Sequence, residues 1–247
     1  MFTSTYRHIH KALPHRENKG LCREAFCIDK VVRRSICYYA GRTTSFRKGR
    51  QGFDMDQKVS EIVRKIIDSD DTTAGGGSAS ALSGAMAAGM VSMVAKLSKK
   101  KPVNLTVEQY DEIADECDQL AEKLKEGCVL DSEAYSMIVD AFKLPKKTEE
   151  EKTARSAAIQ AAAIRAAEVP RDNARMNARV HDLGVLLKGN SNPACASDLA
   201  SALYLSEGGV KDCILNVQAN LGLIKDETVK TELKEDMLDL LLQVICY

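Results

Sequence analysis

The chain alternates between segments with helical hydrophobic periodicity and short polar connections. Apolar residues at Val59, Ile62 and Ile66 follow the spacing of one helix face, which predicts an amphipathic helix over 56–67. A similar helix is predicted after Asp226, with apolar residues at Val229, Leu233, Met237, Leu240, Leu241 and Val244. No segment shows a convincing strand pattern, so the periodicity predicts an all-α, multihelical protein.

Three consecutive glycines, Gly75, Gly76 and Gly77, precede Ser78 and a run of small residues that extends to about Ser98. Glycine can take backbone angles closed to other residues, and Ser78 can cap the helix that the following residues favour. Unpaired N–H groups at such a turn form a site for an anion or the polar edge of a ring. The alternative is a flexible loop. A nucleotide P-loop is excluded because no Gly-Lys-Ser/Thr follows.

The segment 78–98 has little side-chain bulk, which predicts a buried helix that neighbouring backbones approach closely. A membrane span is rejected because serines interrupt the apolar run and Lys99, Lys100 and Lys101 follow it. Adjacent lysines usually mark a solvated helix end. The alternative is an electrostatic site for a polyanionic ligand tail.

A long helix is predicted over 107–142. Its apolar face carries Tyr110, Ile113, Cys117, Leu120 and Leu124, and in the same phase Tyr135, Ile138 and Phe142. Asp131 falls on this buried stripe. A carboxyl group there must be hydrogen-bonded, protonated or facing a cavity, and such surroundings raise its pKa toward neutrality. The alternative is that Gly127 interrupts the helix, so that Asp131 caps a second one.

The next helix is predicted to begin at Thr148, and a further helix is predicted after Pro170, extending to Leu187. Thr148 and the three glutamates after it suit a helix N-terminus as cap and first-turn acids. The alanine content of 154–167 implies tight packing, whereas Pro170 is expected to kink or interrupt the helix.

A second polar loop, 189–198, leads into another helix rich in small residues. At about 100° per residue, Asp198, Asn216 and Asn220 share one face of a continuous helix, which suggests a polar seam at a pocket or a helix interface. Capping of the helix by Ser197 or Asp198, with solvated asparagines, is the alternative.

The charge balance divides the chain in two. The 247 residues hold 35 Lys and Arg against 35 Asp and Glu, but residues 1–53 hold twelve of the basic residues and three of the acidic ones. The acidic remainder, with few aromatics, suits nucleic acid poorly. The basic segment is either a transit peptide or a region upstream of a natural start at Met55, and the abrupt change of composition favours the second. We therefore expect a helical domain at 54–247, with 1–53 outside the fold.

The cysteines show no CxxC pair and no metal-ligand spacing with the four histidines. They are Cys22, Cys27, Cys37, Cys117, Cys128, Cys195, Cys213 and Cys246. We expect buried free thiols, a reducing cytoplasmic location and no bound metal.

A series of motifs resembles, in order and spacing, the cyclodeaminase/methenyltetrahydrofolate cyclohydrolase family, which forms the C-terminal domain of formiminotransferase-cyclodeaminase. The motifs are Thr73 to Ser78, Asp131 to Tyr135, Lys143-Leu144-Pro145, Val169-Pro170, Asn192 through Ser197-Asp198 and Asn216 to Leu221. The resemblance covers about residues 56–246. It implies an all-α bundle with long antiparallel helices, a homodimer and a folate site in a groove near the subunit interface. Thr72 and Ala74 stand where the family pattern has proline, which implies a looser loop.

The resemblance also implies an activity. The family enzyme closes N10 of 5-formiminotetrahydrofolate onto the formimino carbon and releases ammonia, and Asp131 matches its catalytic aspartate. Asp198 is expected to assist as a second catalytic residue. The residues expected to bind the substrate are Gly75, Gly76, Gly77, Ser78, Lys99, Lys100, Lys101, Asn192, Ser197, Asn216 and Asn220.

Two alternatives stay open. One is hydrolysis of the methenyl bridge to 10-formyltetrahydrofolate, and the other is a non-catalytic helical dimer that binds folate. The expected partners are the folate substrate, a second copy of the chain and a separate formiminotransferase, with no nucleic acid, membrane, metal or redox cofactor.

Overall fold

The predicted helical periodicity is confirmed in the computed structural model, which describes residues 59–246. These residues contain six α-helices and one short 3-10 helix, and no strand. The elements are α3 (Val59–Ile67), α4 (Gly76–Ser98), α5 (Val107–Lys143), α6 (Glu149–Leu186), η1 (Pro193–Cys195), α7 (Ala196–Leu221) and α8 (Glu227–Ile245). The predicted basic segment 1–53 lies outside the described residues.

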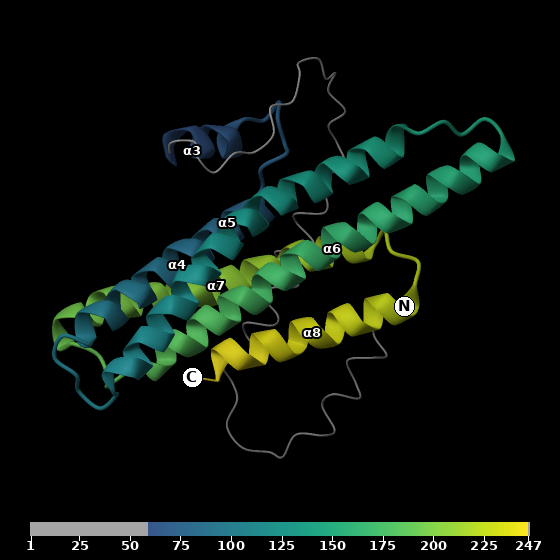
Figure 1. The fold of residues 1–247 in the computed structure, drawn as a ribbon. Coiled ribbons are helices and arrows are strands. Elements are labelled where there is room, and N and C mark those ends of the chain that lie inside the picture. The colour runs from purple at the N-terminus through teal and green to yellow at the C-terminus, as the bar shows by residue number, and fades with distance from the viewer. Residues whose placement is uncertain (1–58, 247) are drawn as a thin grey trace, which may run out of the picture. The chain divides into compact units, whose positions relative to one another are not determined.

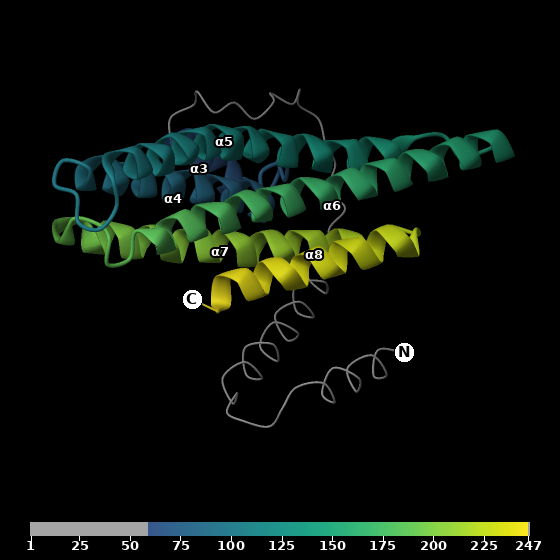
Figure 2. The same cartoon turned by 60° about the horizontal axis from the view of Figure 1, so that its bottom comes forward.

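Four long helices form the bundle that positions the polar residues of interest. Helix α4 packs against α5 and α7, and α6 packs against the same two helices, so the four enclose a common core (Figure 1). Helix α8 lies along α6 and α7 (Figure 2). The apolar side chains between α4, α5, α6 and α7 form the largest buried cluster, and a second cluster joins α6 and α7 to α8.

Side chains cap the starts of three helices, of which the cap at Thr148 was predicted from the sequence. Thr148 and Glu151 form a reciprocal capping box at the start of α6, and Thr106 and Gln109 form another at the start of α5. Asp226 accepts the N–H groups of Thr228 and Val229 at the start of α8. These bonds satisfy backbone donors that a helix cannot pair internally, which explains why the helices begin where they do.

Two interruptions that the sequence left open are absent. Helix α5 runs unbroken through Gly127, so Asp131 lies inside a helix and caps nothing. Helix α6 likewise continues through Pro170. Gly127 is needed for packing: a Cβ atom there would lie 2.0 Å from Asn173 Oδ1 of α6. The residue therefore allows two helices to approach, and it does not end one.

The apolar face predicted for α5 is buried only where other helices cover it. Leu124 is fully buried, but Tyr135 and Phe142 are 40% and 44% exposed. The cause is geometric, because α4 begins at Gly76 beside Asp131 and cannot cover the later turns of α5. The end of α5 and the start of α6 project past the start of α4 (Figure 1).

Buried asparagines of α6 lie against glycines of the neighbouring helices. A Cβ atom at Gly209 of α7 would lie 2.1 Å from Asn177 Oδ1, and one at Gly84 of α4 would lie 2.3 Å from it. Asn177 Nδ2 donates to the Asn173 carbonyl oxygen at 2.9 Å, whereas no hydrogen-bond donor reaches Oδ1 among the described residues. The absence of a side chain at Gly84 and Gly209 thus creates the space in which Asn177 of α6 packs against α4 and α7.

The prediction of buried free thiols is correct for four of the five described cysteines. Cys117, Cys128, Cys195 and Cys213 are buried and free, and Cys246 is exposed. Burial raises the pKa of Cys128 and of Cys213 to about 12. Such thiols behave as small apolar side chains. The remaining cysteines precede the described range.

Helix α4 is long and apolar enough to cross a membrane by length and composition alone, yet 61% of that stretch is buried in the bundle. A core helix that packs between other helices passes the same test. The burial agrees with the predicted close-packed helix.

Replacing Gly209 by alanine should destabilise the protein, because the new Cβ atom would overlap Asn177 Oδ1. We expect a loss of about 1–3 kcal/mol in the free energy of unfolding, the usual cost of overpacking. Gly208 is the matched control, since a Cβ atom there meets nothing within 4 Å, and alanine should stabilise the helix by about 0.5–1 kcal/mol. Urea denaturation of the three proteins in the same oligomeric state measures both. Equal losses in the two variants would contradict the packing argument.

Candidate functional site

The carboxyl group of Asp131 lies against the first turn of α4. Ser78 Oγ is 3.0 Å from Asp131 Oδ2, to which it donates, and 3.3 Å from the Cys128 carbonyl oxygen. The backbone N–H group of Ser78 also bonds this carboxyl group. Ser78 is buried and Asp131 is half-buried. Ser78 of α4 therefore holds the carboxyl group of a residue of α5 that lies 53 positions later in the chain.

The glycines act through their size and not through unusual backbone angles. A Cβ atom at Gly77 would lie 2.1 Å from Asp131 Oδ1, so only glycine permits this approach. Gly76 and Gly77 belong to α4, and the sole described glycine with positive φ is Gly189, at 72°. The predicted glycine turn is therefore wrong, because the helix begins inside the glycine run.

Ser78 was predicted to cap α4, but it does not. The residue before α4 is Gly75, and no side chain caps the helix. The first N–H groups of a helix have no intrahelical partner, and they carry partial positive charge. The N–H group of Ser78 meets Asp131, which leaves those of Gly76 and Gly77 for water or a ligand.

Burial raises the pKa of Asp131, and the bonds from the Ser78 hydroxyl and N–H groups oppose part of that rise. The periodicity of α5 predicts this direction. A carboxyl group whose pKa is raised toward neutrality can both accept and return a proton near physiological pH. The position is thus suited to proton transfer.

Asn216 and Asn220 lie at the same end of the bundle. A Cβ atom at Gly76 would lie 3.3 Å from Asn216 Nδ2. Asn216 Nδ2 donates to the Asp212 carbonyl oxygen at 2.8 Å, and Asn220 Nδ2 donates to the carbonyl oxygens of Ala166 and Asn216 at 2.9 and 3.0 Å. Because Nδ2 of each asparagine donates to main-chain carbonyl oxygens, Oδ1 of each stays available as a hydrogen-bond acceptor. With Asp131, this end therefore offers acceptors to a ligand that carries donors or positive charge.

The other predicted site residues lie at the opposite end of α4 and α7. Asp198 is on the same face of α7 as Asn216, but the intervening residues separate them by about 27 Å along the axis at ~1.5 Å per residue. The main-chain N–H group of Asn192 donates to Ser98 Oγ at 2.8 Å, and its side chain accepts from Ala194 N at 3.0 Å. One chain thus divides the predicted site into two groups.

The second group is largely occupied by the fold itself. Lys99 forms an ion pair with Asp111, whereas Lys100 and Lys101 are exposed. Ser197 is exposed and Asp198 half-buried, and neither caps α7, whose preceding residue is Cys195. Within one chain these residues do not meet Asp131.

The loop before α4 contains contacts that the sequence reasoning missed. Thr72 Oγ1 lies 3.0 Å from the hydroxyl oxygen of Tyr135, and Asp71 Oδ1 accepts the N–H and hydroxyl groups of Thr73 at 3.1 and 2.7 Å. Ala74 is 5% exposed and packs in a cluster that contains Cys128. Side chains thus anchor a loop that the missing prolines were expected to loosen. The spacing of Asp131 and Tyr135, one helical turn apart on α5, was the sequence signal that could have indicated a role for Tyr135 near this carboxyl group.

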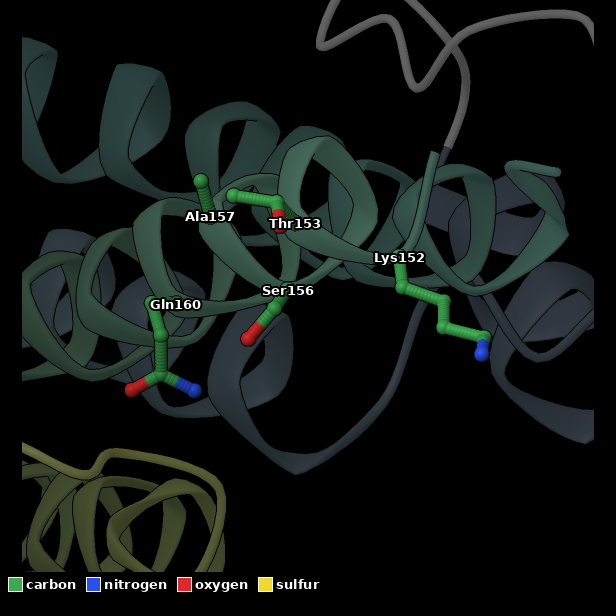
Figure 3. Close-up of a pocket in the computed structure, with 5 residues that line it drawn as sticks. All are labelled: Lys152, Thr153, Ser156, Ala157 and Gln160. Carbon is green, nitrogen blue, oxygen red and sulfur yellow. The ribbon is translucent and has the colours of Figure 1, made fainter. Parts of the chain in front are cut away.

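A shallow hollow lies on the first half of α6. It is lined by Lys152, Thr153, Ser156, Ala157 and Gln160 (Figure 3). Lys225 borders it, with Nζ 3.2 Å from Ser156 Oγ and its N–H group 2.7 Å from Gln160 Oε1. None of the predicted site residues lines this hollow. No group of three or more His, Cys, Asp or Glu suited to a metal occurs within residues 59–246.

The chain is similar in sequence to a known protein family and to several of its members. The profile of the family described as Formiminotransferase-cyclodeaminase matches residues 58–239. A methenyltetrahydrofolate cyclohydrolase of Methylorubrum extorquens is 35% identical over 181 residues, which cover 71% of this chain and 86% of that protein. A formimidoyltransferase-cyclodeaminase of Gallus gallus is 34% identical over 165 residues, which cover 64% of this chain but 29% of that protein.

One solved structure has the same fold. Formiminotetrahydrofolate cyclodeaminase from Thermotoga maritima superposes with a TM-score of 0.68 and 27% identity, covering 76% of this chain and 90% of that one. Several motifs in order, the profile match and the shared fold all lead to one assignment. The chain belongs to the formiminotransferase-cyclodeaminase family, a family of folate one-carbon cyclodeaminases and cyclohydrolases.

Proposed function

We propose that this chain cyclises 5-formiminotetrahydrofolate to 5,10-methenyltetrahydrofolate and releases ammonia. The observation that carries the proposal is the half-buried carboxyl group of Asp131, held by Ser78 with a raised pKa beside Gly77. The reaction must move one proton from N10 to the departing nitrogen. A carboxyl group of this kind is suited to that transfer.

Asp131 can carry the one proton that the reaction moves. N10 attacks the carbon of the protonated formimino group, and a C–N10 bond forms. Asp131 takes the proton of N10 and returns it to the exocyclic nitrogen, whose bond to carbon then breaks to release NH3. The positive charge remains on the N5–C–N10 bridge of the product. Holding N10 against the carbon favours closure because it removes the entropy cost of alignment.

The surrounding polar atoms suit such a substrate. The reacting bridge is cationic, and Asp131 and the Oδ1 atoms of Asn216 and Asn220 are acceptors. The N–H groups of Gly76 and Gly77 can meet an acceptor on the pterin ring. We infer that the ring lies across the first turn of α4.

Hydrolysis of the methenyl bridge to 10-formyltetrahydrofolate is the second candidate. The relative named a methenyltetrahydrofolate cyclohydrolase supports it, since the match covers 86% of that protein. In this reaction Asp131 would take a proton from the water that attacks the bridge carbon and give it to N5 as the C–N5 bond breaks. The hydroxyl group of the adduct would lose its proton to solvent as it becomes the formyl oxygen. Both reactions place the carboxyl group against the same carbon. A cytoplasmic location, independence of metal and redox cofactors, and a separate formiminotransferase partner remain predictions.

Asp131→Asn should lower turnover by at least about 100-fold, because general acid–base catalysis usually contributes that much. Purified protein is given each folate substrate in turn, and absorbance of the methenyl group is followed. Its appearance identifies the cyclodeaminase and its disappearance the cyclohydrolase. Folate binding without turnover would identify a non-catalytic binder. Full activity of the variant would remove Asp131 from the mechanism.

The same variant should be more stable than the parent protein at pH 7. Burial raises the folded-state pKa of Asp131 above the unfolded value, so the protonated carboxyl stabilises the fold. That contribution is complete below about pH 3.9, the ordinary pKa of Asp, and is lost as pH rises through the folded-state pKa. Urea denaturation from pH 4 to 8 should show the advantage of the variant growing with pH. A constant difference at every pH would show that ionisation is not its cause.

We propose that the functional unit is a homodimer, because one chain keeps the two groups of predicted site residues at opposite ends of α4. Met86 and Met93 are 52% and 39% exposed on α4, with the exposed Gly89 between them. A two-fold axis near Gly89 would bury this stripe and bring the start of α4 in one protomer beside the end of α4 in its partner. Asp131 would then face Lys101 and Asp198 of a second copy.

Met86→Glu should therefore convert the protein to monomers and reduce folate turnover with it, since a charge within an apolar interface is costly. Leu238→Glu is the matched control, because Leu238 is 54% exposed on α8. Sedimentation velocity gives the oligomeric state. A dimeric and active Met86→Glu protein would exclude this face as the interface.

A further inference from the structure

The loop between α3 and α4 crosses α5 directly above Asp131. Ala74 packs in the cluster that contains Cys128, and Thr72 contacts Tyr135 through its hydroxyl group. Cys128, Asp131 and Tyr135 follow one another at spacings of three and four residues, so they share a face of α5. Contacts on both sides of Asp131 thus fix the path of the loop.

The two anchors differ in kind. The Ala74 anchor is buried and apolar, whereas the Thr72 anchor is one hydrogen bond between exposed side chains, 3.0 Å long. Asp71 stiffens the segment between them by accepting the N–H and hydroxyl groups of Thr73. These bonds stiffen the loop, and Tyr135 holds its outer edge.

We propose that Tyr135 is a positioning residue: its hydroxyl group, through Thr72, keeps the loop 68–75 over the carboxyl group of Asp131. The importance of this for turnover rests on the proposed function, but the contact itself does not. Release of Thr72 would admit water to the carboxyl group. The nearby N–H groups of Gly76 and Gly77 would then also lose their fixed approach, because the loop leads directly into them.

A direct role in catalysis would require only Tyr135, whereas a role through the loop requires both hydroxyl groups. This difference makes the proposal testable by a double-mutant cycle. Tyr135→Phe and Thr72→Val each remove one member of the pair with little change of shape. If the pair acts as a unit, the double variant should be no worse than either single variant.

The expected result for each single variant is a fall in kcat/KM of about three- to tenfold, the usual effect of one neutral hydrogen bond. The pKa of Asp131, read from carboxyl 13C chemical shifts in the ligand-free protein, should move down toward its ordinary value in both. Thr72→Ser should behave like the parent protein, since it keeps the hydroxyl group. Thr231→Val is the matched control: it removes a hydroxyl bond of 2.8 Å to the Glu227 carbonyl oxygen on α8, far from the loop.

A normal Thr72→Val protein together with an impaired Tyr135→Phe protein would overturn the proposal and give Tyr135 a direct role. Parent behaviour of both single variants would overturn it as well. If no protein turns over folate, the proposed function fails. The ligand-free carboxyl titration and the amide hydrogen exchange of residues 68–75 still decide the positioning role, which requires faster exchange in both single variants.

Discussion

The contact between Gly77 and Asp131 is the constraint on which the site depends. The absence of a side chain at Gly77 lets α4 approach α5 until a carboxyl oxygen occupies the place of the missing Cβ atom. The same approach brings the N–H and hydroxyl groups of Ser78 within reach of that carboxyl group. Close packing and the raised pKa of Asp131 therefore have one cause, because the helix that removes water from the carboxyl group also supplies its hydrogen-bond donors.

This arrangement recurs in the bundle with a different outcome. Asn173 lies against Gly127, and Asn177 lies against Gly84 and Gly209, but both asparagines are fully buried. An amide group in such a position fills the space that the glycine leaves and fixes how the helices pack against one another. Asp131 differs because it is ionisable and only half-buried. The same close approach of a side chain to a glycine thus fills the core where water is excluded, and at Asp131 it places an ionisable group where water or a ligand can enter.

Helical periodicity predicted the elements and the awkward placement of Asp131, because each depends on neighbours within one helix. The breaks that Gly127 and Pro170 allowed are absent, because packing between long helices overrides the local preference of these residues. Periodicity failed for the exposed Tyr135, since burial there depends on where α4 begins. The Thr72–Tyr135 contact joins residues 63 positions apart. Contacts of that kind depend on how helices pack, which one sequence does not reveal.

Asp198 shows why the sequence motifs, although they identify the family, do not lie together in one site of a single chain. The helical phase rightly places it on the face of Asn216, but a shared face says nothing about separation along the axis. A ligand touching both residues in one chain would have to span about 27 Å. Helices α4 and α7 are continuous and packed along their length, so bending cannot close that distance. If both groups serve one folate molecule, the second must come from another copy of the chain, and the exposed stripe of α4 is placed at the midpoint that such a pairing requires.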